Sequence, residues 1–501
     1  MGAGEEADLL AAVSIKLPLL ERKKMKKGHN RREFFREGVI SGAVLATQLR
    51  SAPAAAAKLK EAYAISEGPL VPEDWRRLKA MSERVFTGNR VVLPQGTVHM
   101  PSAGKYESLF GWDSGWQAIA MTRMDPALAA SEIEVLFSFQ EDNGRVSHNT
   151  RLRALEENPG DDSLKNRALG NSTQWDEMGR SAMIDPPSYI IAAEKIYART
   201  QDREWLSRML PRLEACLDYL SRERDLFGDG LVSVIHPWET GTDSSPAYDQ
   251  LLGLNFNTPL GAPLRGLLYP RLLKFNAEFN WDPPEAKQRN RFVLEDICFN
   301  SITVRAVLSA ANLNRAMGET GKAEEFTNQA RAMVAALERI NWVEAEGCYF
   351  SRYDAKHPQL ALRTTASSLL PMLTGLISPE RAERIVTEHL TNPQEFWLPF
   401  VVSFNAKDEL DREKVYLEDL LLWRGHCIWI NMNWMITEAL LAYGWTDLAR
   451  EVTRRTARMI LHEGLYEFYD FRNGQGKGAA DFNWPGLILD MIAVTWPEIV
   501  A

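Results

Sequence analysis

Cysteine is scarce in this sequence. The 501 residues include only 4 Cys, at positions 216, 298, 348 and 427. They lie far apart, form no C-x-x-C pair and are not accompanied by histidines at ligand spacing, which argues against a zinc site and against a dense disulfide framework. We therefore expect four free, buried cysteines. The sequence also lacks a series of βαβ units with a glycine-rich phosphate turn, which argues against Rossmann and P-loop proteins.

A basic stripe is missing as well. The net charge is −9, and residues 1–57 hold 10 Lys and Arg against 6 Asp and Glu, which leaves 48 against 61 and a charge of −13 in the rest. An acidic body of this kind argues against nucleic acid or an anionic membrane surface as a partner. With 45% hydrophobic residues, the chain can still bury a large core.

The first 57 residues resemble a twin-arginine export signal. Arg31-Arg32 precedes an apolar run at 38–49, and small residues follow at 51–57. The apolar run is too short to span a bilayer, which needs about 20 helical residues, and the small residues suit a cleavage site. We expect residues 1–57 to be an N-terminal extension with a signal peptide, with Met25 as a possible true start. The mature protein would then be exported, to the periplasm, without a membrane anchor.

From Lys58 to Ala501 apolar residues recur mostly at helical spacing. Helices are predicted over Ala127–Gln140, Pro187–Arg199, Glu204–Arg222, Asp296–Met317, Lys322–Trp342, Pro379–Leu390 and Trp429–Tyr443. Helix pairs follow one another without a Pro/Gly/Ser-rich linker, which favours one all-α toroid of about twelve helices over separate bundles. We expect function where the loops between helices converge on one mouth of this toroid.

The segment at 106–117 places aromatic rings and an acid beside small residues. Tyr106, Trp112 and Trp116 could pack against a sugar ring while Asp113 binds its hydroxyls. The alternative is a loop end with a helix cap and two core Trp, and this segment alone does not decide between them.

A second segment, at 236–246, has two acids around a Thr-Gly-Thr turn beside Trp238. Partial desolvation would raise the pKa of a carboxyl there, as a proton donor to a glycosidic oxygen requires. Asp243 is the candidate acid, and Glu239 a candidate binding residue. The alternative is an exposed turn in which the Asp caps a local N–H.

A third segment, at 464–474, places Glu467 among aromatic residues. Three glycines follow Glu467, at 474, 476 and 478, and we expect them to form a flexible loop. Trp423-Arg424 and Trp484 would add a cation and an aromatic wall, although they could equally be a buried Arg paired with an acid and further core Trp. Two carboxyls are the minimum for glycoside hydrolysis, and Asp243 and Glu467 supply them.

The ordered segments F-G-W-D-S-G-W, W-E-T-G-T-D-S-S-P, W-R-G-x-x-W-I-N-x-N-W and Y-E-F-Y-D-F-R-N-G-x-G-x-G resemble glycoside hydrolase family 63, and most of all its bacterial mannosylglycerate and glucosylglycerate hydrolases. The resemblance spans about residues 75–495. It implies an (α/α)6 barrel, an exo-acting α-glycosidase that inverts the anomeric centre, and chemistry without a cofactor or a metal. The matched motifs make Asp243 the general acid and Glu467 the general base. The resemblance also implies that Tyr106, Trp112 and Asp113 line the pocket for the sugar, with Trp423 and Arg424 close by.

Two departures from the family pattern affect the substrate. Where members usually have Gln before a Pro pair, this chain has Asp185, which we expect at a pocket wall. The stretch at 251–292 is longer than the compact hydrolases need and could reshape the leaving-group side. The expected substrate is therefore a small carbohydrate: an α-linked glucoside or mannoside, either an oligosaccharide or a glycosylglycerate.

Two other functions fit the same toroid. A polysaccharide lyase or a sugar epimerase needs a Tyr or His base, and of the 8 His only His236 lies in a candidate motif. A non-catalytic sugar-binding protein would bind the ligand without releasing reducing sugar.

Overall fold

The computed structural model describes residues 68–152, 171–254, 257–412 and 422–500. All of them belong to the unit that spans residues 58–501. The predicted boundary after residue 57, the twin arginines, the apolar run and the small-residue segment lie outside the described residues.

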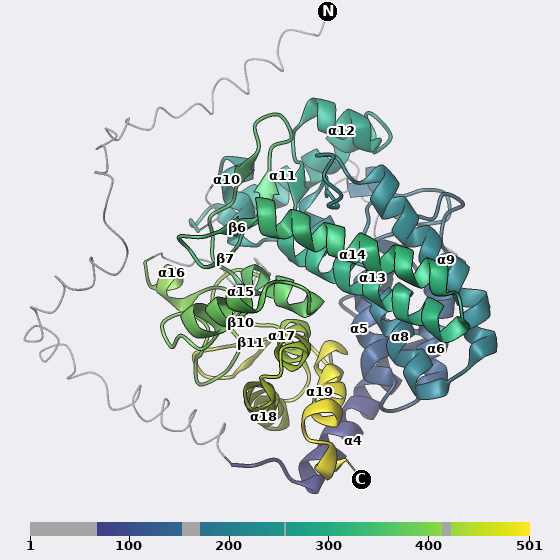
Figure 1. The fold of residues 1–501 in the computed structure, drawn as a ribbon, viewed down its shortest axis with the longest axis vertical. Helices are drawn as coiled ribbons and strands as arrows, with labels where there is room; N and C mark the ends of the chain where they lie inside the picture. Colours follow the sequence, from purple (N-terminus) through teal and green to yellow (C-terminus); the bar gives the residue numbers. More distant parts are fainter. Residues whose placement is uncertain (1–67, 153–170, 255–256, 413–421, 501) are drawn as a thin grey trace, which may run out of the picture. The chain divides into compact units, whose positions relative to one another are not determined.

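The contacts between six inner elements close a ring, and Figure 1 labels α5, α8, α13, α17 and α19 among them. Helix α5 packs on α8, α8 on α13, α13 on η5 and η5 on α17, and both α17 and α5 contact α19 and the preceding turn η8. In chain order the six are α5 (Gly111–Met121), α8 (Ser188–Thr200), α13 (Ile297–Met317), η5 (Ala366–Thr374), α17 (Ile430–Ala442) and α19 (Ile488–Thr495), and the turn η8 (Trp484–Leu487) comes directly before α19.

An outer helix precedes each inner element along the chain. These helices are α4 (Pro72–Asn89), α6 (Pro126–Ser138), α9 (Arg203–Glu223), α14 (Thr320–Ile340), α15 (Pro379–Arg384) with its continuation η6 (Ile385–Leu390), and α18 (Thr446–Glu463). Helix α6 packs on α5 and α8, α14 packs on α13, and α18 packs on α17, α19 and α4. This alternation of outer and inner helices is the predicted all-α (α/α)6 barrel.

The seven helices predicted from periodicity are all present, with ends that agree to within about two residues. Side-chain caps fix several of the beginnings: Asp202 accepts a hydrogen bond from the N–H of Trp205, and Asp296 from that of Phe299. Inner helices are apolar nearly all round because they are enclosed, and every residue from Ile430 to Thr437 is buried.

Short antiparallel strands and minor helices fill the connections between the main helices. The strands are β1 (Arg90–Leu93), β2 (Gly96–His99), β3 (Ser108–Phe110), β4 (Asn149–Arg151), β5 (Leu294–Glu295), β6 (Trp342–Val343), β7 (Cys348–Tyr349), β8 (Arg352–Tyr353), β9 (Gln359–Leu360), β10 (Cys427–Ile428), β11 (Tyr466–Asp470) and β12 (Gly476–Ala480). They pair as β1-β2, β3-β4, β5-β8-β9, β6-β7 and β10-β11-β12. The minor helices are η2 (Asn171–Gln174), η3 (Pro237–Thr240), η4 (Pro246–Tyr248), α10 (Asp249–Leu252), α11 (Gly261–Ala277), α12 (Pro283–Arg289), α16 (Lys407–Asp411) and η9 (Pro497–Ile499).

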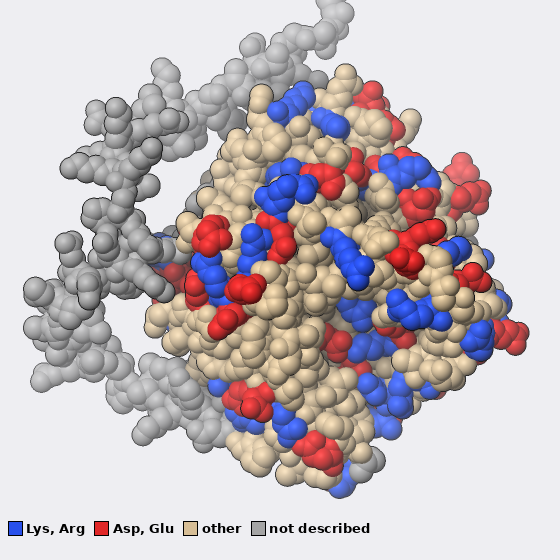
Figure 2. Space-filling view, in the orientation of Figure 1, with Lys and Arg blue, Asp and Glu red and all other residues tan. Residues whose placement is uncertain are grey.

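The four cysteines are free and buried, as predicted. Within the described part of the chain, no helix is both long and apolar enough to cross a bilayer. On the face drawn in Figure 2, basic and acidic side chains of the described residues are interspersed.

Candidate active site

A cavity of about 380 Å³ opens where the segments before α5, α17 and α19 converge. Both predicted catalytic acids, Asp243 and Glu467, lie in its wall, and so do six of the predicted sugar-binding residues. The full lining is Pro101, Tyr106, Phe110, Trp112, Asp113, His148, Asn149, Gln174, Trp238, Gly241, Asp243, Arg265, Leu422, Trp423, Trp429, Glu467, Phe482 and Trp484. The toroid therefore brings segments from most of the chain's length to one hollow.

The loop that carries Asp243 is held from two sides. Tyr269 on α11 donates a hydrogen bond of 2.7 Å from its hydroxyl to the main-chain carbonyl of Asp243. Gly241 has a φ of +74°, and a Cβ there would lie 2.6 Å from the Trp112 ring, so this turn requires glycine. Burial raises the pKa of Asp243 to about 7, and the charge of Glu467 raises it while that of Arg265 lowers it. The side chain can thus hold a proton near neutral pH.

Glu467 lies on β11, at an irregularity in the pairing of β11 with β12 between Tyr466 and Phe468. Such a bulge redirects a side chain. Its carboxylate is 2% exposed and accepts three hydrogen bonds. The donors are the Nζ of Lys105 at 2.6 Å and the main-chain N–H of Ala479 at 2.7 Å, both to Oε2, and the hydroxyl of Tyr106 at 2.5 Å to Oε1. Several independent contacts thus orient this acid.

The glycines after Glu467 do not form the flexible loop expected from the sequence. Two of them, Gly476 and Gly478, belong to β12, which pairs with β11. A Cβ at Gly476 would lie 2.2 Å from the ring of Tyr466, and one at Gly474 would lie 2.6 Å from the ring of Phe400. These positions need glycine because side chains pack against the backbone, which makes the hairpin tight.

Four tryptophans form one aromatic wall. Trp423 stacks on Trp429, with ring centroids 3.9 Å apart and an interplanar angle of 10°, and Trp112 meets Trp484 edge-on at 5.2 Å. Trp423 has a φ of +68°, which is unusual for a bulky residue and typical of functional sites. A flat apolar wall of this kind suits the face of a sugar ring.

Asp113 is the third carboxyl in the cavity. It lies in the first turn of α5 and is 6% exposed. Burial raises its pKa well above the ordinary value, and the charges of Glu467 and Asp243 add to this. Burial likewise raises the pKa of Tyr106 above its usual range, so its hydroxyl remains a donor.

Two predicted binding residues lie behind the wall. Trp116 is fully buried and packs between Trp112 and Trp434, with centroid distances of 6.1 and 5.5 Å. Asp185 is also fully buried, and its Oδ2 accepts a hydrogen bond of 2.9 Å from the main-chain N–H of Trp112. The expectation of an acid at the pocket wall is therefore corrected: Asp185 supports the beginning of α5 from behind.

The prediction that Glu239 and Arg424 bind the substrate is corrected as well, because neither lines the cavity. Glu239 pairs with Arg224, both almost fully buried, and also accepts hydrogen bonds from the main-chain N–H groups of Ile184 and Ile235. Arg424 pairs with Asp249 and donates from Nε to the carbonyl of Ser244 at 3.2 Å. Both residues brace the loop of the acid and contribute no surface to the cavity.

Three lining residues carry no signal in the sequence: His148 and Asn149 on or beside β4, and Gln174 on η2. Arg265 on α11 belongs to no motif, but it lies in the stretch at 251–292 that was expected to reshape the leaving-group side. Burial lowers the pKa of His148 to about 4, so this imidazole is neutral, and its Nδ1 has no hydrogen-bond partner among the described residues.

His236, the candidate base for a lyase, does not line the cavity. Its Nδ1 accepts from the N–H of Trp238 and its Nε2 contacts the carbonyl of Tyr269. Burial lowers the pKa of His236 to about 3. Both ring nitrogens are occupied in the core, so His236 is in no position to abstract a substrate proton.

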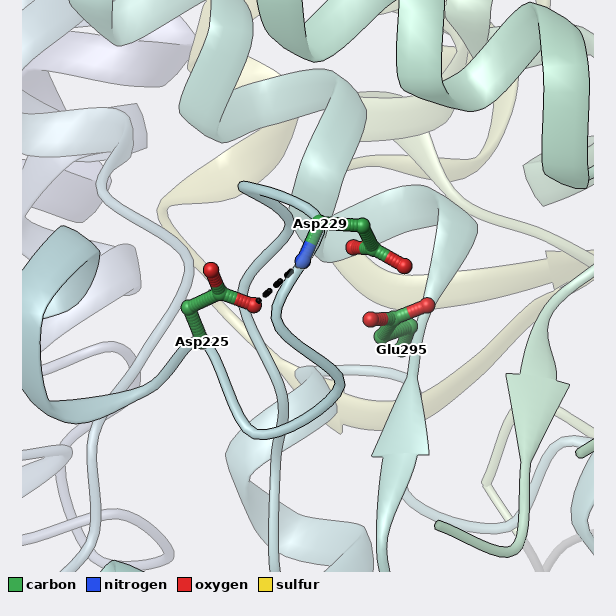
Figure 3. A group of neighbouring side chains, drawn as sticks. All are labelled: Asp225, Asp229 and Glu295. Atoms are coloured by element: carbon green, nitrogen blue, oxygen red, sulfur yellow. Dashed lines mark hydrogen bonds between the residues drawn. The ribbon is translucent and has the colours of Figure 1, made fainter. Parts of the chain in front are cut away.

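Away from the cavity, the carboxyls of Asp225, Asp229 and Glu295 converge within 4.8 Å (Figure 3). Burial, together with the charge of Asp229, raises the pKa of Glu295 to about 9. An oxygen-only group could suit a hard cation. However, Arg352 pairs with both Asp229 and Glu295 and already supplies a positive charge there.

The chain is similar to known glycoside hydrolases. Residues 106–485 match the family model described as the mannosylglycerate hydrolase MGH1-like glycoside hydrolase domain. A mannosylglycerate hydrolase from Rubrobacter radiotolerans is 27% identical over 432 residues, which cover 79% of this chain and 93% of that protein. A glucosylglycerate hydrolase from Mycolicibacterium hassiacum is 22% identical, with 81% and 96% covered.

Among solved structures, the glycoside hydrolase family 63 mannosylglycerate hydrolase from Thermus thermophilus in complex with Tris and D-glycerate superposes with a TM-score of 0.69. It is 25% identical, and the match covers 84% of this chain and all of that one (100%). The matched family segment contains both candidate acids and all but Pro101 of the cavity lining. The chain therefore belongs to the mannosylglycerate hydrolase MGH1-like branch of glycoside hydrolase family 63, and it is an inverting α-glycosidase.

Proposed function

We propose that Asp243 and Glu467 are the general acid and the general base of this α-glycosidase. The observation that carries the proposal is their presence in the wall of one cavity, where each carboxyl is surrounded differently. In the proposed reaction, the protonated Asp243 gives its proton to the glycosidic oxygen. The ionised Glu467 removes a proton from a water that attacks C1 on the opposite face.

The surroundings of the two acids suit these different roles. The pKa of Asp243, raised by burial to about 7, leaves a useful fraction of the side chain protonated at neutral pH. Glu467 instead accepts three hydrogen bonds, which hold its carboxylate in one orientation, as a base that must receive a water from one direction requires. The tryptophan wall would hold the sugar ring and exclude solvent, so that binding orients C1 between the acids.

We propose further that the leaving group is a small carboxylic acid with a hydroxyl, such as glycerate. Arg265 lies in the cavity wall near the acid loop, where its Nη1 is 3.2 Å from the hydroxyl of Ser244. A guanidinium in the cavity wall beside the proton-donating acid suits a carboxylate on the departing group. The named relatives act on glycosylglycerates, which agrees with this choice.

The experiment is a panel of α-mannosylglycerate, α-glucosylglycerate and neutral α-disaccharides, with the product anomer followed by proton NMR. We expect the glycosylglycerates to be hydrolysed fastest and the first product to be the β-anomer. The Asp243→Asn and Glu467→Gln variants should each lose about 1,000-fold or more in kcat. Full activity in either variant would refute the assignment, and preference for a neutral disaccharide would refute the leaving group.

Export remains a proposal that rests on the N-terminal sequence. Arg31-Arg32 and the segments after it suit the twin-arginine route, which carries folded proteins. A reporter fused to residues 1–60 should accumulate in the periplasm. The same fusion with both arginines replaced by lysine should not accumulate there. Equal accumulation of the two fusions would contradict the proposal.

A further inference from the structure

The carboxylate of Glu467 has little room left for the attacking water. An ionised carboxylate offers about four acceptor sites, two on each oxygen. On Oε2, the Nζ of Lys105 and the N–H of Ala479 occupy both sites, at 2.6 and 2.7 Å. On Oε1, the Tyr106 hydroxyl occupies one site at 2.5 Å. Counting the contacts of the described residues, one acceptor site remains, and it is on Oε1.

Lys105 owes its position to an anchored turn. The N–H of Tyr106 bonds to the carbonyl of Ser102 at 3.0 Å, and the hydroxyl of Ser102 bonds to the carbonyl of Ala480 on β12 at 3.0 Å. The turn is thus tied to the strand that also supplies the N–H of Ala479. Although the side chain of Lys105 is 46% exposed, its ammonium reaches a carboxylate that is only 2% exposed.

The other charged groups near Glu467 make a cation useful at this point. Asp113 on α5 and Asp243 on the acid loop both respond to the charge of Glu467, which raises their pKa values. Three carboxyls therefore share one cavity. A salt bridge between two exposed groups contributes little, but a cation bonded to a buried carboxylate is poorly screened by solvent.

We propose that Lys105 is a positioning residue for the reaction: with Ala479 it saturates Oε2 of Glu467, so that Oε1 alone receives the attacking water. This inference rests on the proposed role of Glu467 as the base. Lys105 itself touches neither the sugar nor the water. Its loss leaves Oε2 as a second, misdirected acceptor and lets the carboxylate rotate.

The test compares Lys105→Met with Lys105→Arg and with Lys79→Met. Lys79 is a matched control because it is a partly exposed lysine on α4, 3.7 Å from Glu83, that does not line the cavity. With α-mannosylglycerate or α-glucosylglycerate, whichever the wild type hydrolyses faster, we expect K105M to lower kcat by about 10- to 100-fold. KM should change by less than about twofold, because the residue acts in the transition state and not in binding.

The conservative K105R variant should keep most of the wild-type kcat, and K79M all of it. As a second readout, the rate of K105A should rise with added ethylammonium chloride and not with the same concentration of sodium chloride. This comparison does not depend on the K105M protein folding well. A K105M kcat equal to wild type, a rise in KM alone, or no response of K105A to ethylammonium would each overturn the inference.

The variant E467Q separates the two levels of the proposal. If E467Q is active, Glu467 is not the base and the proposed function fails. If E467Q is inactive while K105M behaves like wild type, the proposed function stands and only the role of Lys105 is wrong.

Discussion

The backbone of Gly478 approaches Glu467 so closely that a Cβ there would lie 2.4 Å from Oε2 of the carboxylate. Gly478 also has a φ of +72°, a conformation that costs an L-residue about 1–2 kcal/mol. This glycine therefore lets β12 support the proposed base from behind.

Gly478→Ala should lower kcat by about 100-fold, because the methyl group pushes the carboxylate out of position. Gly444→Ala is the matched control, since Gly444 has a φ of +79° with no neighbouring atom within 4 Å. Both variants carry the cost of the positive φ, and Gly478→Ala should lose more stability than Gly444→Ala because of the added contact, measured by urea unfolding. Equal activity of the two variants would show that the contact with Glu467 is unimportant.

The pH dependence should reflect the protonation of Asp243. The acid must carry its proton, and its pKa is raised to about 7, so kcat/KM should fall as pH rises through about 7. Because the charge of Arg265 lowers this pKa, the Arg265→Met variant should move the falling limb to higher pH. A limb that does not move in R265M would contradict the electrostatic contact.

Arg265→Met should also discriminate between leaving groups. We expect KM for the glycosylglycerate to rise about 10- to 100-fold, because a charge-assisted hydrogen bond is lost. A neutral methyl α-glycoside of the same sugar is the internal control, and its KM should stay within about twofold of wild type. A parallel rise for both substrates would mean that Arg265 shapes the cavity and does not bind a carboxylate.

Asp243 should destabilise the folded protein at high pH. Its folded pKa of about 7 lies above the ordinary value of 3.8, so its contribution to stability is complete below the unfolded pKa and is lost as pH rises through 7. The Tm of Asp243→Asn should therefore exceed that of wild type by about 1–3 °C more at pH 8.5 than at pH 5. The exposed Asp142, replaced by Asn, should show no such difference between the two pH values.

Glu239→Gln tests whether this acid is structural. It pairs with the buried Arg224 at 2.8 Å, so the substitution should cost about 3–5 kcal/mol in the free energy of unfolding, measured with urea. The control is Glu134→Gln, which breaks the exposed pair with Arg208 at 3.0 Å and should cost less than about 1 kcal/mol. Similar losses in the two variants would contradict the bracing role.

The sequence alone determined the helices, their pairing into a toroid and the segments that surround the cavity. Apolar periodicity is a local property, so the ends of Pro379–Leu390 and of the other predicted helices could be read without tertiary information. The motifs likewise marked Asp243 and Glu467, because both acids stand in ordered segments that resemble those of glycoside hydrolase family 63.

Only the tertiary structure decided which side of each loop faces the substrate. Trp112 and Trp116 lie four residues apart in one motif, yet the first lines the cavity and the second is buried in the core. Glu239 pairs with Arg224, whereas Asp243, in the same loop, faces the cavity. His148 and Arg265 line the cavity, although neither belongs to a motif. The physical reason is that closing the toroid sets which polar groups meet a buried partner and which are left facing the hollow, and one sequence does not encode those pairings locally.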